Sequence, residues 1–213
     1  AAIDLLVALH AHAPPEGLAP YGPEAMAPLA GLAAEWYLPG VTDTPPPGRA
    51  GAALVVACRA ALERCAPETP VLTLRDYHAG NLLWLPERTG VARVGLLDFQ
   101  DAMAGHPAYD LVSLLRDARR DVEPALRQRM TARYVAATGH EPDRFAAACA
   151  ALSTQRNLRI LGVFARLWLR DGKPFYIDLI PRVWGHLQDD LAHPALAGLR
   201  EVVDQTLPEP TPA

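Results

Sequence analysis

The strongest constraint on the fold is a polar segment, TLRDYHAGNLLW at residues 73–84, that lies between two β-forming runs. One run precedes it at 71–74 and the other follows at 82–85. A third run, VARVGLLDF at 91–99, comes after PERTG, whose proline and glycine are typical of a hairpin connection. The pattern therefore predicts a short strand, a polar loop and a hairpin whose return strand ends at Asp98.

The remaining apolar residues mostly recur at helical spacing, so the chain is predicted to be mostly α with a small β-hairpin insert. Residues 38–48, LPGVTDTPPPG, are predicted to form a loop. Gly139 is predicted to end one helix as its C′ residue, and a break near Ser153 in the longest helix stays open as an alternative. Helices are expected at 2–12, around 26–37, at 50–65, from Pro107, and at 124–138, 142–170, 177–191 and 194–206.

Length and composition exclude several classes of protein. The 213 residues, which carry a net charge of −4, show no basic cluster interleaved with aromatic residues, so nucleic acid is not an expected partner. The longest apolar run, at 50–58, is too short to cross a membrane. Three cysteines without a pairing pattern indicate a reducing compartment, and we expect a cytoplasmic protein. The first residues already show helical periodicity and no starting Met, which predicts a longer protein upstream.

Three oxygen-bearing side chains are predicted to meet at one end of the hairpin. Asp76 and Asn81 lie in the polar loop, and Asp98 lies at the end of the return strand. Phosphoryl transfer to a hydroxyl uses this set of groups, because one carboxylate accepts the hydroxyl proton while an amide oxygen and a second carboxylate hold Mg²⁺. Mg²⁺ takes few protein ligands, so one Asn and one Asp are sufficient. A loop cap is the alternative reading of the Asp and the Asn by themselves.

LRDYHAGN, followed by GLLDFQDAMAGHPAYDLVSLL, resembles the catalytic half of the aminoglycoside phosphotransferase and choline kinase superfamily, whose fold is protein-kinase-like. Within that superfamily, RDYHAGNLLWL and YDLVSLLRDARR look most similar to the cell-wall-recycling kinases that phosphorylate the anomeric hydroxyl of N-acetylmuramate and N-acetylglucosamine. The resemblance covers about residues 1–200. It implies the C-terminal lobe of a protein-kinase-like α+β fold, with a catalytic lobe at 1–206 and a flexible tail at 207–213.

The resemblance also implies roles for individual residues, with ATP and Mg²⁺ as cofactors. Two positions depart from the family pattern: Leu74 replaces the usual His, and Gln100 replaces the Gly of the Asp-Phe-Gly motif. The implied roles are catalytic base for Asp76, metal ligands for Asn81 and Asp98, structural support for Arg75 and Asp110, and acceptor contacts for His78, Gln100 and Asp101.

No glycine-rich loop or strand lysine precedes the motif, and Lys173, the only lysine, lies far downstream. The nucleotide-clamping N-terminal lobe is therefore missing from this sequence, and the expected partners are that lobe of the same protein and a small-molecule substrate.

Several alternatives stay open at this stage. Aminoglycosides, choline and homoserine are other acceptors that the superfamily accommodates. A chain without a nucleotide lobe could also be a module that binds a sugar or a partner without transferring phosphate. A hydrolase is a third class, in which His78 and His106 would hold Zn²⁺ or Mn²⁺ together with Asp76 and Asp98.

Overall fold

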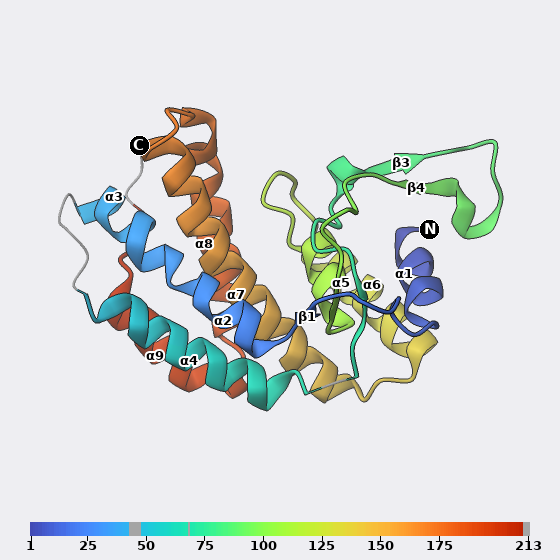
Figure 1. Ribbon diagram of the computed structural model, residues 1–213, viewed down its shortest axis with the longest axis horizontal. Coiled ribbons are helices and arrows are strands. Elements are labelled where there is room, and N and C mark those ends of the chain that lie inside the picture. The colour runs from blue at the N-terminus through green and yellow to red at the C-terminus, as the bar shows by residue number, and fades with distance from the viewer. Residues whose placement is uncertain (43–47, 68, 211–213) are drawn as a thin grey trace. The chain divides into compact units, whose positions relative to one another are not determined.

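The computed structural model describes residues 1–42, 48–67 and 69–210. The chain divides into two compact units (Figure 1). Unit 1 consists of Ala1–Gly22 and Pro67–Cys149, and unit 2 consists of Pro23–Ala66 and Ala150–Ala213. Asp76, Asn81 and Asp98 all belong to unit 1, so this unit contains the entire predicted catalytic cluster.

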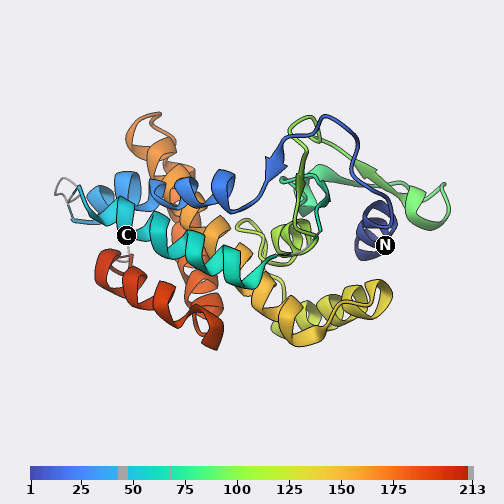
Figure 2. The ribbon, with the colours of Figure 1, turned by 60° about the horizontal axis from the view of Figure 1, so that its bottom comes forward.

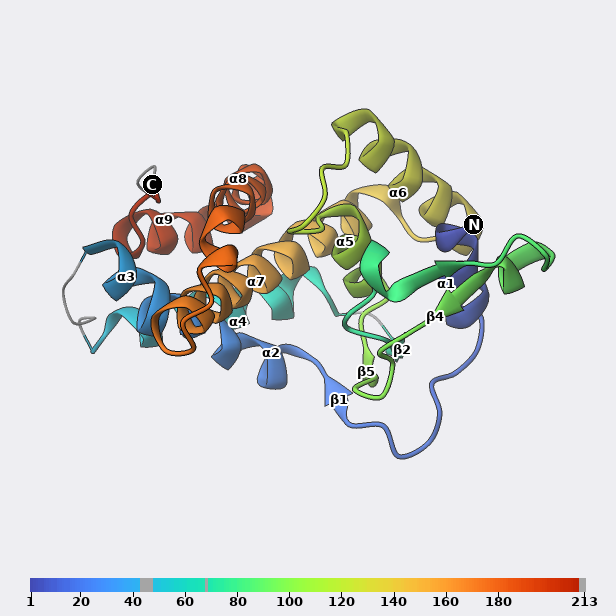
Figure 3. The ribbon, with the colours of Figure 1, turned by 90° about the horizontal axis from the view of Figure 1, so that it is seen from above.

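Unit 1 combines helices with two small sheets. Helices α1 and α6 lie side by side (Figure 3). Gly139 ends α6 in the left-handed conformation, with φ of 75°, as the sequence predicts. The elements are α1 (Ala2–His10), β1 (Pro20–Tyr21), β2 (Val71–Thr73), a 3₁₀ turn (Ala79–Asn81), β3 (Leu82–Trp84), a second 3₁₀ turn (Gly90–Arg93), β4 (Val94–Leu96), β5 (Met103–Gly105), α5 (Ala108–Leu115), α6 (Pro124–Thr138) and the start of α7 (Pro142–Leu169).

The predicted hairpin is confirmed, and it is a separate two-stranded sheet. β3 pairs antiparallel with β4, with Leu82 opposite Leu96 and Trp84 opposite Val94. The strand before the polar loop does not join this hairpin. Instead β2 pairs antiparallel with β5, and β5 pairs parallel with β1, which gives the order β1-β5-β2. The polar loop therefore connects two sheets, and both β1 and β5 escaped sequence-based prediction because they are only two and three residues long.

Unit 2 is helical. Helix α4 lies beside α9 (Figure 2) and also contacts α2. The elements are α2 (Pro23–Ala30), a π-helix (Ala33–Tyr37), α3 (Leu38–Thr42), α4 (Ala50–Cys65), the rest of α7, a 3₁₀ segment (Pro174–Leu179), α8 (Ile180–Leu191), a 3₁₀ turn (Pro194–Leu196) and α9 (Ala197–Thr206).

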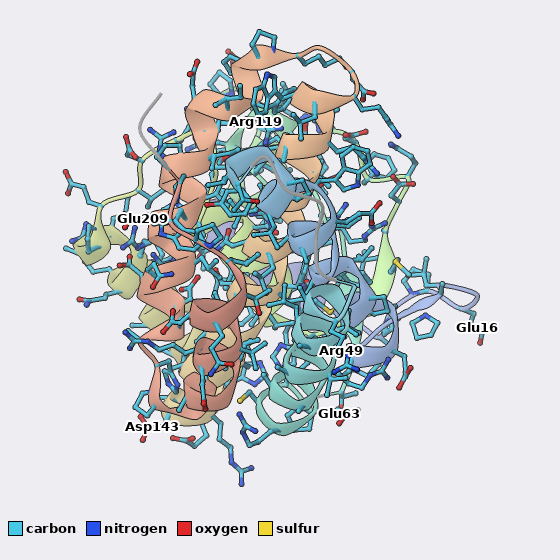
Figure 4. All side chains as sticks on the ribbon, turned by 90° about the vertical axis from the view of Figure 1, so that its left-hand side faces the viewer. Glu16, Arg49, Glu63, Arg119, Asp143 and Glu209 are labelled. Atoms are coloured by element: carbon cyan, nitrogen blue, oxygen red, sulfur yellow. The ribbon has the colours of Figure 1, made fainter. Side chains whose placement is uncertain are left out.

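Helix α4 shows why this unit folds as it does. Its buried residues recur at intervals of three and four, which places them on one face: Leu54, Cys58, Ala61, Leu62 and Cys65. Arg49 before the helix and Glu63 within it are exposed (Figure 4). Burial raises the pKa of the Cys58 thiol to about 12, so this cysteine is a core residue and not a reactive one.

Helix α7 runs unbroken from Pro142 to Leu169, so no break occurs at Ser153. Ser153 is buried inside the helix and lies 3.4 Å from the side chain of Asn157 one turn later. Gly162 permits the helix to approach Leu32 closely, because a Cβ at this position would overlap the Leu32 carbonyl group.

Other sequence-based expectations need correction. Residues 38–42 form α3 although they contain Pro39 and Gly40, while 43–47 of the same predicted loop lie outside the described residues. The return strand begins at Val94 and not at Val91, because a 3₁₀ turn occupies 90–93. The overall prediction, mostly helix with a small hairpin, is confirmed.

The C-terminal segment after α9 contacts the rest of unit 2. Within the segment expected to be a flexible tail, Leu207 is buried and the Pro208 carbonyl accepts a hydrogen bond of 2.7 Å from the Tyr37 hydroxyl. Among the described residues, none of the helices has the length and apolar character that crossing a membrane requires.

Candidate active site

The polar loop after β2 is shaped by two tight turns of its own backbone. The Asp76 N–H donates to the Leu74 carbonyl at 2.9 Å, and the His78 N–H donates to the Asp76 carbonyl at 3.0 Å. Arg75, the central residue of the first turn, adopts φ of 71°, a left-handed conformation that costs a non-glycine residue about 1 kcal/mol or more. The surrounding contacts must therefore hold this loop in place.

Asp110, in the first turn of α5, supplies the main contacts that hold it. Its Oδ2 accepts the Leu74 N–H at 2.6 Å and its Oδ1 accepts the Arg75 N–H at 2.9 Å. The side chain is only 1% exposed. Hydrogen bonds to a buried carboxylate are among the stronger ones in proteins, so Asp110 fixes the backbone immediately before Asp76.

Asn81 connects the loop to the hairpin. Its side-chain Nδ2 donates to the Asp76 carbonyl at 3.0 Å, which fixes the amide so that Oδ1 is the oxygen left to bind a ligand. Its backbone carbonyl accepts the Leu97 N–H at 2.9 Å, one residue before Asp98. Asn81 thus contacts Asp76 on one side and Leu97, the residue before Asp98, on the other.

Asp98 itself follows β4 in a second left-handed conformation, with φ of 58°. Its carboxylate is exposed, and Oδ1 accepts a hydrogen bond of 2.7 Å from Nε2 of Gln100. Asp tolerates the left-handed region better than most residues, and strained backbone of this kind collects at functional sites. The strain at Arg75 and Asp98 therefore marks both ends of the predicted cluster.

The three residues predicted to contact the acceptor have distinct local roles. His78 Nδ1 accepts the Gly80 N–H at 3.1 Å and so caps the 3₁₀ turn that carries Asn81. Gln100 orients Asp98, as described above. Asp101 is exposed, and its carbonyl accepts a hydrogen bond of 3.2 Å from the Arg75 guanidinium. Each of the three therefore also stabilises the loops that carry the candidate catalytic groups.

Two supporting residues were not predicted from the sequence. Ser113, fully buried in α5, lies with Oγ 3.4 Å from the Arg75 carbonyl. It stands three positions after Asp110 and so shares its helix face, a spacing that could have identified it. Tyr21 of β1 lies beneath the Arg75 guanidinium at 5.0 Å, and no local pattern links it to a residue so distant in the sequence.

The hydrolase alternative finds no support. Among the described residues, no group of three or more His, Cys, Asp or Glu side chains could hold a metal ion. His106 is buried, its Nδ1 accepts the Ala108 N–H at 3.0 Å, and burial lowers its pKa to about 3. This histidine therefore caps the start of α5. A Mg²⁺ site formed by one Asn and one Asp needs no such three-residue group.

A pocket of about 420 Å³ in unit 1 includes one loop residue, Ala79, but none of the three cluster residues. Its walls are mostly apolar and come from the start of α1, from α5 and from α6. Asp117 lines it and is buried, with Oδ1 accepting the N–H of the exposed Arg119 (Figure 4) at 2.9 Å. The cluster is thus separate from this apolar pocket.

Residues 1–147 match the model of the phosphotransferase enzyme family. A protein from Caulobacter vibrioides named N-acetylmuramate/N-acetylglucosamine kinase is 53% identical over 146 residues, which are 68% of this chain and 40% of that protein. A protein with the same name from Pseudomonas aeruginosa is 36% identical over 151 residues, which are 67% of this chain and 43% of that protein. Another, from Neisseria meningitidis, is 40% identical over 121 residues, which are 54% of this chain and 35% of that protein.

A solved structure extends the likeness to the fold. The choline/ethanolamine kinase family protein from Mesorhizobium loti superposes with a TM-score of 0.62, covering 94% of this chain and 64% of that one. The two are 14% identical, so this likeness concerns the fold alone. The matched part of this chain spans less than half the length of the curated relatives.

Proposed function

Because this chain belongs to the phosphotransferase enzyme family, we propose that it forms the catalytic lobe of a kinase that phosphorylates a hydroxyl of a small amino sugar. ATP would be the phosphoryl donor and Mg²⁺ the metal. The observation that carries the proposal is the double connection of Asn81, whose side chain contacts the Asp76 carbonyl and whose backbone contacts the residue before Asp98.

Asp76 is proposed as the catalytic base. Its backbone is held on both sides, by the two bonds to Asp110 and by the Asn81 amide. The acceptor hydroxyl would give its proton to the Asp76 carboxylate as its oxygen forms a bond to the γ-phosphorus. The bond from that phosphorus to the bridging oxygen then breaks, and ADP leaves with the electron pair. Such a step depends mainly on positioning and charge neutralisation, and a rigid loop supplies the positioning.

The oxygens of Asn81 and Asp98 fit Mg²⁺ in kind. The Asn81 amide nitrogen is engaged, which leaves Oδ1, and the Asp98 carboxylate keeps Oδ2 beside the oxygen that Gln100 contacts. Hard oxygen ligands are what Mg²⁺ prefers, with water and phosphate oxygens completing its coordination. When bound, the ion would neutralise the charge of the phosphates during transfer.

The acceptor is proposed from the three relatives described above, all of which carry the name N-acetylmuramate/N-acetylglucosamine kinase. An anomeric hydroxyl of these sugars is accordingly the first candidate, and aminoglycosides, choline and homoserine are the alternatives. We further propose that a nucleotide-binding lobe of the same protein completes the site, with the enzyme acting in the cytoplasm in cell-wall recycling.

The test is a phosphorylation screen of the full-length protein with ATP, Mg²⁺ and these sugars and amino alcohols. Asp76→Asn should lower kcat by about 10²–10⁴-fold, the usual contribution of a general base. Asp143→Asn, at an exposed position of the same unit (Figure 4), is the matched control and should leave kcat unchanged. Normal turnover in Asp76→Asn would remove this residue from the role. Sugar binding without transfer by the wild type would favour a binding module instead.

A further inference from the structure

We propose that Tyr21 is a positioning residue for the catalytic loop, acting through Arg75 on the segment that carries Asp98. The tyrosine lies on β1, more than 50 residues before the loop, and is 3% exposed. Its ring lies 5.0 Å from the Arg75 guanidinium carbon. The inference rests on the proposed function only where kcat is measured, because its structural part can be tested without phosphoryl transfer.

Arg75 joins the two halves of the predicted cluster. Its backbone immediately precedes Asp76 and is bound to Asp110. Its side chain reaches in the other direction, where Nη1 donates to the Asp101 carbonyl at 3.2 Å, three residues after Asp98. A single arginine thus joins the loop of the proposed base to the segment of the proposed metal ligand.

The guanidinium needs a fixed orientation to make this connection, and Tyr21 supplies one. Arg75 Nε is buried and has no hydrogen-bond partner among the described residues. An arginine in that state gains from an aromatic face, because the ring attracts the cation without needing a hydrogen bond. A ring in this position would also restrict the rotamers of the Arg75 side chain, which would keep Nη1 directed at the Asp101 carbonyl.

The ring of Tyr21 is itself fixed. Its hydroxyl lies 3.2 Å from the hydroxyl of Tyr109, and the two rings meet edge to face at 5.1 Å. Tyr109 immediately precedes Asp110 on α5. β1 is also paired in register with β5, where Tyr21 lies opposite Gly105. Two elements therefore fix the position of Arg75. Helix α5 binds its backbone through Asp110 and supports Tyr21 through Tyr109, and strand β1 carries Tyr21 itself.

The experiment compares Tyr21→Leu with the conservative variant Tyr21→Phe in the full-length protein. Amide hydrogen exchange at residues 98–102 should accelerate about 2- to 30-fold in Tyr21→Leu, the ratio that the usual strength of a cation–π contact produces. The kcat of the same variant should fall by a similar factor, with the KM for the acceptor changed less than about twofold. Tyr21→Phe keeps the ring and should recover most of both effects.

The control is Tyr134→Leu, which removes another fully buried tyrosine of the same unit, on α6. Tyr134→Leu should lower the free energy of unfolding without accelerating amide exchange at 98–102. If Tyr21→Leu acted only through a general packing defect, both variants would accelerate exchange at 98–102. If Tyr21→Leu does not fold, Arg75→Met removes the cation and should give the same local acceleration. Unchanged exchange at 98–102 in the folded variants would overturn the inference, even if kinase activity is present. Absent kinase activity with accelerated exchange would overturn only the proposed function.

Discussion

Acidification should destabilise this protein through two histidines of unit 1, the half-buried His10 and the buried His106. His10 of α1 lies with Nδ1 2.6 Å from the Tyr134 hydroxyl, and burial lowers its pKa to about 4. His106 lies before α5, and burial lowers its pKa to about 3, with smaller contributions from His140 and His10. His106 Nδ1 accepts the Ala108 N–H, so protonation of this nitrogen would break the first hydrogen bond of α5.

The sign and the magnitude follow from the pKa difference between folded and unfolded chains. An unfolded histidine takes up its proton near pH 6.5, whereas both folded histidines stay neutral until far lower pH. The two neutral histidines therefore make their whole contribution to the free energy of unfolding above about pH 7. This contribution is lost as the pH falls from 6.5 towards 4. At pH 5 each histidine lowers the free energy of unfolding by about 2 kcal/mol relative to pH 7.5, because each pKa unit corresponds to about 1.4 kcal/mol.

The assay is urea-induced unfolding of the wild type and of His10→Phe at pH 7.5 and at pH 5.0. The loss of unfolding free energy between the two pH values should be smaller by about 2 kcal/mol in His10→Phe. His12→Phe is the matched control, since His12 is exposed two residues away, and it should leave the pH dependence as in the wild type. An equal loss in the wild type and in His10→Phe would refute the reasoning.

Three further predictions concern the loop supports, the core and the metal site. Asp110→Asn should lower the unfolding free energy by about 2–3 kcal/mol, because one buried backbone N–H then faces an amide donor; a loss under about 0.5 kcal/mol in urea unfolding would contradict this. Gly162→Ala should lower the free energy of unfolding by about 3 kcal/mol or more, because the added Cβ would overlap the Leu32 backbone. Gly185→Ala is the control and should not lower it, because its added Cβ meets no atom within 4 Å. Equal melting temperatures for the two variants would contradict this prediction. Asp98→Ala should abolish Mg²⁺-dependent nucleotide turnover in the full-length protein, and unchanged metal dependence would exclude Asp98 as a ligand.

Sequence patterns predicted the elements in which local signals agree with packing. Helix α4 was predicted with its observed bounds because its apolar face and its flanking Pro67 give the same boundary. Gly139 ended α6 as expected because its side-chain-free backbone accepts a positive φ. The hairpin β3–β4 was predicted because the two runs flank a turn-forming segment.

The same reasoning failed where tertiary contacts decide the structure. Residues 38–42 are helical although they contain Pro39 and Gly40, because α3 continues directly from the preceding π-helix and its first residue, Leu38, is buried. β1 and β5 carry no periodic signal over two or three residues. They exist because they pair with each other and because β5 also pairs with β2.

The candidate site divides in the same way. The order Asp-x₄-Asn and the later Asp were visible in the sequence because the flanking apolar runs predict a loop and a hairpin that carry them. The left-handed backbone of Arg75 and Asp98 was not visible, because both residue types usually occupy ordinary conformations. Nor could the sequence indicate Tyr21, whose contact with Arg75 depends on the parallel pairing of β1 with β5.

The central claim is that Asn81 and Asp98 bind one metal ion beside Asp76. The most direct test is a crystal structure of the full-length protein grown with ADP and Mn²⁺, which replaces Mg²⁺ and can be located by its anomalous scattering. We expect one anomalous peak about 2.1–2.3 Å from Asn81 Oδ1 and from an Asp98 carboxylate oxygen, with the Asp76 carboxylate facing the space beyond the β-phosphate. A metal bound to the nucleotide but to neither side chain would contradict the account.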